Sequence, residues 1–226
     1  MNHSAPSSPA PASCSAPIQQ STSTIPISIQ QLGLVPYRPT WQQMCDFTRS
    51  RDANTVDELW LLEHPPTYTT GIASKPEHEP HSAVGIPIER IDRGGQITYH
   101  GPGQLVAYVL LDLKRRQLGI RKLVRLLEQG VIDLLADFDI SATGNPSAPG
   151  VYVGSAKIAA LGLRIKNGCC YHALALNVDL DLWPFEHINP CGYPNLSVTR
   201  MRDFGITATP DQISPLLAQH ITDTLS

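Results

Sequence analysis

The sequence lacks several features that would assign it to a large class of proteins. Its 226 residues contain no run near the roughly eighteen apolar residues of a membrane-spanning helix. Its 17 Lys and Arg residues are outnumbered by 20 Asp and Glu residues, giving a net charge of −3. This balance does not favour the broad cationic surface that binds nucleic acid, although a local patch can still dock a partner. We therefore expect a soluble protein that binds neither nucleic acid nor membrane.

Cysteine is scarce and irregularly spaced. The chain has five cysteines, an odd number without a Cys-x-x-Cys pair. Such usage argues against a disulfide framework and against a cysteine-rich zinc site, so we expect free thiols in a reducing cytoplasm and no bound metal. The adjacent Cys169 and Cys170 point to opposite faces of a strand and cannot bind one ion together, so we interpret them as packing residues.

The N-terminal segment, residues 1–24, has almost no large apolar residues and is dominated by Ser, Pro, Ala and Thr. It offers too little apolar surface to offset the entropy of ordering, and we expect a disordered tail. The first Lys or Arg of the chain is Arg38, which argues against a signal peptide and an Arg-rich transit peptide. Residues 25–226 are long enough for one α/β domain, and a second full domain is not expected.

Nucleotide-binding motifs are also missing. The stretch RGGQITYHGPGQ, residues 93–104, gathers glycine and proline around an Arg, a Tyr and a His. It fails the pattern Gly-x-Gly-x-x-Gly because Val106 stands at the third glycine position, and the chain has no Gly-Lys-Ser/Thr phosphate loop. Neither a nicotinamide cofactor nor a Walker-type nucleotide is expected. The clustered glycines fit a backbone that approaches a ligand closely and equally a tight double turn at a strand end.

The patterns that are present alternate between strand and helix. Apolar or alternating runs predict strands over residues 25–34, 57–64, 86–91 and 104–113. Helices are predicted from a capping Thr40 with Gln43, over residues 120–138, and from Thr209 with Pro210 in its first turn. Two apolar segments, residues 150–165 and 169–180, flank the turn KNG and predict a hairpin, and residues 65–71 are predicted as loop.

Cys191 differs from the other cysteines because it stands between Pro190 and Gly192 in the stretch INPCGYPN. Pro190 fixes the backbone before the cysteine, and Gly192 adds no side chain after it. The sulfur is therefore accessible to a substrate, as a nucleophile must be. Its reactivity would depend on a nearby cation, and a lone loop cysteine is more often inert. His187 lies four residues earlier, but Pro190 disfavours the helix that would pair the two side chains.

Two further polar residues stand in apolar strand patterns. Lys157 in GSAKIAALG is either buried with a partner or, more commonly for a lone lysine, points outward from an edge strand. Strict alternation would place Lys157 and Ala160 on opposite faces. His172 in CCYHALALN fits a metal ligand, a base or a satisfied core histidine, of which the last is the most common.

Taken together, these stretches resemble the lipoyl(octanoyl) transferase family. The resemblance is carried by RGGQITYHGPGQLVAY, AKIAALGLRI, HALALNVDLDLWPFEHINPCG and the following SV, and it covers about residues 25–226. It implies an α/β fold with a mixed sheet, like that of the biotin and lipoate protein ligases. It also implies ATP-independent transfer of an octanoyl group, without a cofactor, from octanoyl-acyl carrier protein to a lysine. The implied acceptors are lipoyl domains of 2-oxoacid dehydrogenases and the glycine cleavage H protein.

The resemblance also implies roles for individual residues. Cys191 would carry the acyl thioester, and Lys157 would favour its thiolate form. The residues implied to bind substrate are Arg93, Gly94, Gly95, Gln96, Ile97, Thr98, Tyr99, His100, Ala160, Leu161, Gly162, Ala173, Leu174 and Ala175. The family commonly has Gly where Ala173 stands here, and the added methyl would narrow the acyl pocket or shift the backbone.

Three other functions compete with this interpretation. An ATP-dependent lipoate or biotin ligase on the same fold would need a nucleotide but not Cys191. A cysteine hydrolase with His100 or His172 as base would release free octanoate. A binding module for a carrier domain would keep the fold without the chemistry, but the presence of both Lys157 and Cys191 in their motifs argues against it.

Overall fold

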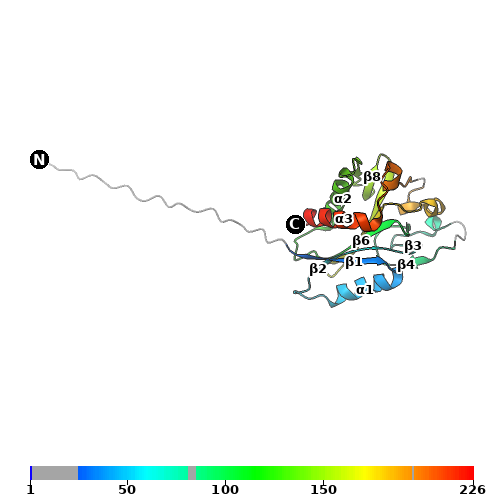
Figure 1. Ribbon diagram of the computed structural model, residues 1–226. Helices are drawn as coiled ribbons and strands as arrows, with labels where there is room; N and C mark the ends of the chain where they lie inside the picture. Colours follow the sequence, from blue (N-terminus) through cyan, green and yellow to red (C-terminus); the bar gives the residue numbers. More distant parts are fainter. Residues whose placement is uncertain (2–24, 81–84, 195) are drawn as a thin grey trace.

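A seven-stranded sheet with helices on both faces forms the body of the protein (Figure 1). The computed structural model describes residues 1, 25–80, 85–194 and 196–226, so the predicted tail beyond Met1 lies outside the described residues. The strands are β1 (Ile27–Leu34), β2 (Asp57–Glu63), β6 (Gln104–Asp112), β7 (Thr143–Gly144), β8 (Gly150–Val153), β9 (Ala156–Lys166) and β10 (Cys169–Asn177). Their spatial order is β1-β2-β6-β10-β9-β8-β7. Because β1 and β2 are parallel and the other neighbours antiparallel, the sheet is mixed, as predicted.

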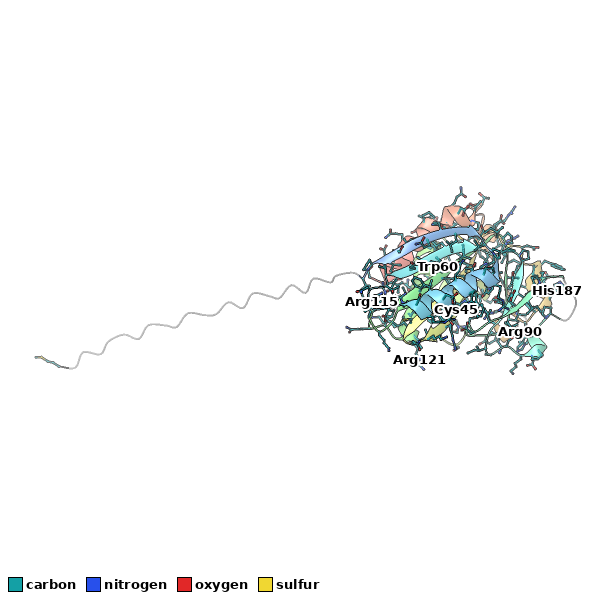
Figure 2. All side chains as sticks on the ribbon, turned by 90° about the horizontal axis from the view of Figure 1, so that it is seen from below. Cys45, Trp60, Arg90, Arg115, Arg121 and His187 are labelled. Carbon is teal, nitrogen blue, oxygen red and sulfur yellow. The ribbon has the colours of Figure 1, made fainter. Side chains whose placement is uncertain are left out.

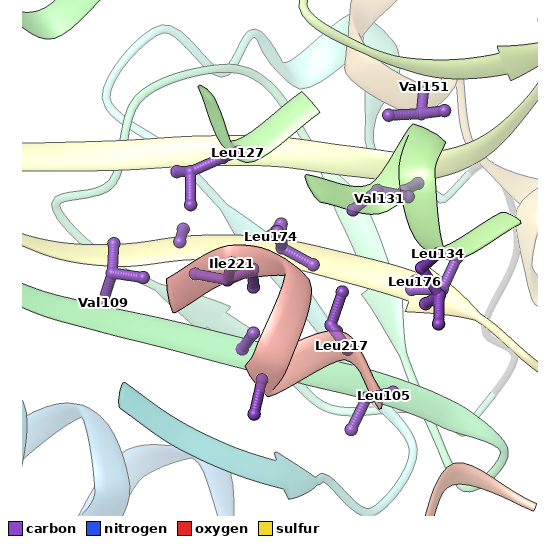
Figure 3. Packing of buried hydrophobic residues seen from close by; sticks show 14 of the residues in the cluster. Leu105, Val109, Leu127, Val131, Leu134, Val151, Leu174, Leu176, Leu217 and Ile221 are labelled. Atoms are coloured by element: carbon purple, nitrogen blue, oxygen red, sulfur yellow. The ribbon is translucent and has the colours of Figure 1, made fainter. Parts of the chain in front are cut away.

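Helices α2 (Ile120–Ala136) and α3 (Pro210–Thr224) cover one face of this sheet (Figure 1). Figure 3 shows Leu127 and Val131 of α2 and Leu217 and Ile221 of α3 packed toward Leu174 of β10, and all five are buried. Each such side chain contributes about 2 kcal/mol by leaving water. The predicted apolar stripe of α2 is confirmed, as is the start of α3 after Thr209, whose side chain forms a capping box with Gln212.

Helix α1 (Tyr37–Ser50) covers the opposite face. Its Met44 is fully buried beside Trp60 of β2, and Figure 2 shows Cys45 and Trp60 on this side of the molecule. The predicted start at Thr40 is wrong, because the helix begins three residues earlier. Thr40 lies inside the first turn, where its hydroxyl donates to the carbonyl of Pro36 at 2.8 Å.

A second sheet of three strands lies beside the first (Figure 1). It contains β4 (Ile88–Arg90), β3 (Thr67–Thr70) and β5 (Thr98–His100) in the order β4-β3-β5. The prediction of a loop at residues 65–71 is therefore wrong. Thr and Tyr favour strands when neighbours pair with them, and here β4 and β5 pair with β3 on both sides. Short helical turns complete the described chain: η1 (Pro76–His78), η2 (Trp183–His187), η3 (Pro190–Gly192) and η4 (Met201–Phe204).

The predicted hairpin is confirmed for β9 and β10. Asn167 and Gly168 connect them with φ of 54° and 83°, as a type I′ turn requires. The preceding segment, residues 150–165, is not one strand but two, β8 and all of β9 except its last residue. Gly154 at φ 59° makes the tight turn that separates them.

A buried carboxylate with three arginines supports the end of the sheet away from the second sheet. The Asp57 side chain is 0% exposed. It pairs with Arg51, with Arg115 at 2.6 Å and with Arg116 at 2.5 Å. The side chains of Arg51 and Arg116 are only 4% and 5% exposed, so the carboxylate neutralises charge that water does not reach.

The Asp57→Asn variant is expected to lose about 3 to 5 kcal/mol of unfolding free energy, because it leaves Arg51 and Arg116 buried without a counter-charge. Urea unfolding followed by circular dichroism measures this loss. The control is Asp46→Asn, which breaks the exposed pair with Arg49 and should cost at most about 1 kcal/mol. Equal losses in the two variants would contradict the assignment.

In the part of the chain that the structure describes, no helix is both long enough and apolar enough to cross a membrane.

Candidate active site

A cavity of about 380 Å³ lies where the two sheets meet helix α2 and the turn η3. Its walls come from β5, β6, β9 and β10, and from the segment between β4 and β5. Its size falls at the lower end of the range for small-molecule sites. The cavity is the place where the stretches that carry the family resemblance converge.

Cys191 and Lys157 meet at the wall of this cavity. The Lys157 Nζ lies 3.2 Å from the Cys191 Sγ and 3.2 Å from the carbonyl oxygen of Pro149. It also lies 5.1 Å from the centre of the Tyr152 ring, within the range of a cation–π contact. Lys157 is 4% exposed, whereas Cys191 is partly exposed. The lysine is therefore buried with a partner and does not point outward from an edge strand.

Irregular pairing of β9 aims Lys157 at the cavity. A bulge interrupts the register between β8 and β9, so that Lys157 and Ala160 both line the cavity although strict alternation separates them. The backbone N–H of Lys157 donates to Ser197 at 2.8 Å, and the N–H of Thr199 donates to Lys157 at 3.0 Å. A side chain at Gly150, where φ is 147°, would lie 2.9 Å from Lys157 Cε, so this glycine leaves room for the lysine.

The contact with Cys191 affects the pKa of Lys157. Burial lowers the pKa of Lys157, but the negative charge of the Cys191 sulfur and the Tyr152 phenol outweigh it, and the pKa is raised above its ordinary value. Lys157 is consequently an ammonium at neutral pH. A buried ammonium beside a thiol stabilises the thiolate, which is the nucleophilic form.

Cys191 is held in an unusual backbone conformation. Its φ is 57° and that of Gly192 is 78°, so both residues lie in the left-handed region. The N–H of Cys191 donates to the carbonyl of Ile97 at 3.1 Å, which ties the turn η3 to the glycine-rich segment. An added Cβ at Gly192 would lie 2.8 Å from Gln96, so the glycine permits this close approach. Strain of this kind concentrates at functional sites.

Nearly all the residues that the resemblance implies for substrate binding line the cavity. They are Arg93, Gly94, Gly95, Gln96, Ile97, Thr98, His100, Ala160, Leu161, Gly162, Ala173, Leu174 and Ala175. Tyr99 does not, because alternation along β5 turns its ring to the other face. There it packs edge-on against Phe185, with 5.6 Å between ring centres. The tilted ring of Tyr68 lies on the same side, also with 5.6 Å between ring centres. Tyr99 therefore supports the strand from behind.

The histidines proposed for a hydrolase both line the cavity, but neither contacts Cys191. His100 contacts Gln104 at 2.7 Å and Thr69 at 3.2 Å, and burial places its pKa well below the ordinary value. His172 is 2% exposed in β10, and its Nε2 lies 3.8 Å from Asp92. Within the described residues, neither histidine is hydrogen-bonded to Cys191, and no group of His, Cys, Asp and Glu side chains is placed to hold a metal. His187 packs edge-on against Trp183, with 4.3 Å between ring centres.

Sequence reasoning missed part of the lining. Tyr37 of α1 and Tyr108 of β6 line the cavity beside Arg93. Ile120 and Val124 of α2 line it as well, although their spacing indicated only a core stripe. The sequence carries no signal for Ile120, because its 50% exposure is a property of the folded structure.

Comparison with known proteins places this arrangement in a family. Residues 36–222, most of the chain, match the family described as Lipoyl protein ligase A/B catalytic domain. The chain belongs to this family. An octanoyltransferase of Azoarcus sp. (strain BH72) is 57% identical over 198 residues, which cover 88% of this chain and 87% of that protein. An octanoyltransferase of Thiobacillus denitrificans (strain ATCC 25259 / T1) is 62% identical over 184 residues, which cover 81% and 84%.

Solved structures of more distant proteins share the fold of this lipoyl protein ligase A/B domain. A lipoate-protein ligase A bound with ATP has a TM-score of 0.72 at 20% identity and covers 88% of this chain and 85% of its own. A biotin protein ligase from Aquifex aeolicus has a TM-score of 0.53 at 11% identity and covers 89% and 69%. At such identities the likeness concerns the fold alone, and it confirms the expected ligase-like architecture.

His64 is a buried histidine that contacts the cavity-lining Tyr108 and the backbone of Val35. The carbonyl of Val35 lies 2.7 Å from His64 Nδ1, which must donate to it, and Nε2 then accepts from the Tyr108 hydroxyl at 2.7 Å. The neutral ring makes both bonds, and burial disfavours the charged ring. Burial lowers the pKa of His64 to about 4, although the Val35 carbonyl opposes this shift.

We expect the unfolding free energy to fall as the pH drops below about 6.5, the value for an unfolded histidine. The native state resists protonation until about pH 4, so His64 alone removes about 3 kcal/mol across this window. Urea unfolding at pH 7 and pH 4.5 measures the loss. The His64→Gln variant keeps a donor and an acceptor but does not titrate, and its stability should depend less on pH. An unchanged pH dependence in this variant would contradict the prediction.

Proposed function

We propose that this protein takes an octanoyl group from octanoyl-acyl carrier protein onto Cys191 and passes it to the ε-amine of a lysine on a lipoyl domain. The chain is an acyltransferase, and octanoyl transfer in protein lipoylation agrees with its family and with relatives named octanoyltransferase. The observation that carries the proposed route is the 3.2 Å contact between Lys157 Nζ and Cys191 Sγ at the cavity wall.

In the first half-reaction, the Cys191 thiolate attacks the carbonyl carbon of the donor thioester. A new carbon–sulfur bond forms to Cys191, and the bond to the sulfur of the carrier arm breaks. The departing thiolate takes the proton of the Lys157 ammonium, which leaves octanoyl-Cys191 and a neutral lysine. One thioester replaces another, so the step needs no ATP.

In the second half-reaction, the neutral amine of the acceptor lysine attacks octanoyl-Cys191. An amide forms, Cys191 departs as a thiolate, and neutral Lys157 accepts the proton that the amine loses. The ammonium and thiolate are thereby restored. Lys157 donates a proton in one half-reaction and accepts one in the other, which agrees with its contact to the sulfur on which both steps occur.

The cavity supports an acyl chain as the transferred group. Beside the reactive pair, its wall includes Ile97, Leu161, Leu174 and Val124. Apolar side chains of this kind bury a hydrocarbon chain favourably, at roughly 0.8 kcal/mol per CH₂. Ala173 also lines the cavity, so its methyl group occupies space that the usual glycine would leave open.

Reconstitution without nucleotide tests the proposed function. Purified protein is incubated with octanoyl-acyl carrier protein and a lipoyl domain from a 2-oxoacid dehydrogenase or the glycine cleavage H protein. We expect octanoyl amide on the acceptor lysine. A requirement for ATP and free octanoate would identify a ligase, and free octanoate as the main product would identify a hydrolase. Carrier binding without any product would identify a binding module.

The domain bounds and the cellular location are also proposals. Residues 25–226 would form the catalytic domain, with residues 1–24 as a separate tail. We place the enzyme in the cytoplasm, because the free thiol of Cys191 requires a reducing environment.

A further inference from the structure

The segment before and at the start of α2 carries an unusual concentration of charge. Residues 113–127, LKRRQLGIRKLVRLL, contain six Lys and Arg residues and no Asp or Glu, in a chain whose net charge is −3. The six are Lys114, Arg115, Arg116, Arg121, Lys122 and Arg125. So dense a run of one sign creates a local cationic surface on an otherwise acidic protein.

The fold uses only part of this charge. Arg115 and Arg116 pair with the buried Asp57. Arg121, Lys122 and Arg125 are exposed, and no salt bridge within the described residues involves them. Of these three, Arg121 and Arg125 form the cationic rim and are available to a partner, whereas Lys122 lies about 200° around the helix from Ile120 and faces away from the cavity.

The cationic rim borders the mouth of the cavity. Ile120 and Val124 lie one turn apart on α2 and line the cavity. Each helical residue rotates by about 100°, so Arg121 and Arg125 form the next strip around the helix. Leu123, which faces the core, lies on the other side of the cavity-lining strip. A partner that reaches into the cavity over α2 consequently passes Arg121 and Arg125.

We propose that the cationic rim docks the acyl donor, an acidic carrier domain that brings the octanoyl thioester on a phosphopantetheine arm. This inference rests on the proposed function. The choice of donor follows from charge. The arm carries an anionic phosphodiester, which two arginines at the mouth attract. The acceptor inserts a lysine that is an ammonium in water, and the same arginines repel it.

The mouth also offers apolar contact beside this charge. Ile120 is 50% exposed and Tyr193 is 45% exposed, and both line the cavity. An exposed apolar centre with a charged border is the arrangement of a transient protein interface. The charges guide the carrier to the mouth, and the apolar centre excludes water from the arm.

The double variant Arg121→Glu/Arg125→Glu tests the assignment by kinetics with three substrates. With octanoyl-acyl carrier protein, we expect kcat/KM to fall about ten- to a hundredfold, through KM. The dependence of this kcat/KM on NaCl concentration should weaken as well, because the variant has lost the charge attraction that salt screens. Acylation of Cys191 by octanoyl-N-acetylcysteamine, a neutral donor without phosphate or protein, should be unchanged, and the KM for the lipoyl domain should not rise.

Two further variants control for nonspecific charge effects. Arg121→Lys/Arg125→Lys keeps the charge and should keep most of the carrier activity. Lys166→Glu reverses an exposed charge at the end of β9, a residue that does not line the cavity, and it should change the KM for the carrier little.

Several results would overturn the inference. They are a rise in the KM for the lipoyl domain without one for the carrier, an equal loss with the small thioester, or no change with any substrate. Failure of the proposed function itself looks different, because wild-type Cys191 would then be acylated by neither donor.

Discussion

The Cys191→Ser variant is expected to lose octanoyl transfer by at least about a thousandfold while it keeps its fold and its affinity for the octanoyl carrier. The sulfur accepts the acyl group in the first half-reaction and leaves in the second, so both steps depend on it. A serine hydroxyl is far less acidic than a thiol, and the neighbouring ammonium cannot ionise it at neutral pH. Transfer measured by intact mass of the acceptor domain, together with carrier binding, checks the prediction.

Cys169→Ser is the matched control, because Cys169 is also a partly exposed free thiol but lies at the far end of β10. It should retain wild-type transfer. If Cys191→Ser retains substantial transfer, the nucleophile has been misassigned. If both variants lose transfer equally, the loss reports a general effect of removing thiols.

The Lys157→Ala variant is expected to lose about a hundred- to ten-thousandfold in both half-reactions, the range typical for removing a general acid or base. Without the ammonium 3.2 Å from its sulfur, Cys191 loses the charge that stabilises its thiolate. The rate at which iodoacetamide alkylates Cys191 at pH 7 should therefore fall. Single-turnover acylation and deacylation, measured separately, show whether both steps fail.

Two other variants separate the roles of charge and proton transfer. Lys157→Arg keeps a cation but cannot act as a base, so it should restore alkylation more than it restores transfer to the acceptor. Lys166→Ala removes an exposed lysine from the end of the same strand and should change neither. An alkylation rate for Lys157→Ala equal to that of the wild type would remove Lys157 from its assigned role.

Local sequence patterns predicted the elements that have a clear apolar spacing or a characteristic turn sequence. The stripe of α2 and the KNG hairpin are confirmed because helix spacing and a turn with positive φ are properties of a few neighbouring residues. The contact of Lys157 with Cys191 spans 34 residues and joins a bulged strand to a strained turn. Spacing alone could not predict it, and the expectation came from the family resemblance.

The failures have tertiary causes. Strand β3 looked like a loop because its pairing partners lie elsewhere in the chain. Helix α1 begins at Tyr37, whose side chain is buried at the cavity wall by contacts that lie outside its own segment. The bulge in β9 places Ala160 and Lys157 on the same side of the strand. It depends on pairing with β8, which the sequence of β9 alone does not encode.

The most direct test of the account is the acylation of Cys191 by octanoyl-acyl carrier protein alone, without acceptor, ATP or metal. The protein is analysed by intact mass and then by peptide mapping, with hydroxylamine to cleave a thioester. We predict one octanoyl adduct per chain, on the peptide that contains Cys191, labile to hydroxylamine and absent from Cys191→Ser. No adduct, or an adduct on another residue, would contradict the account.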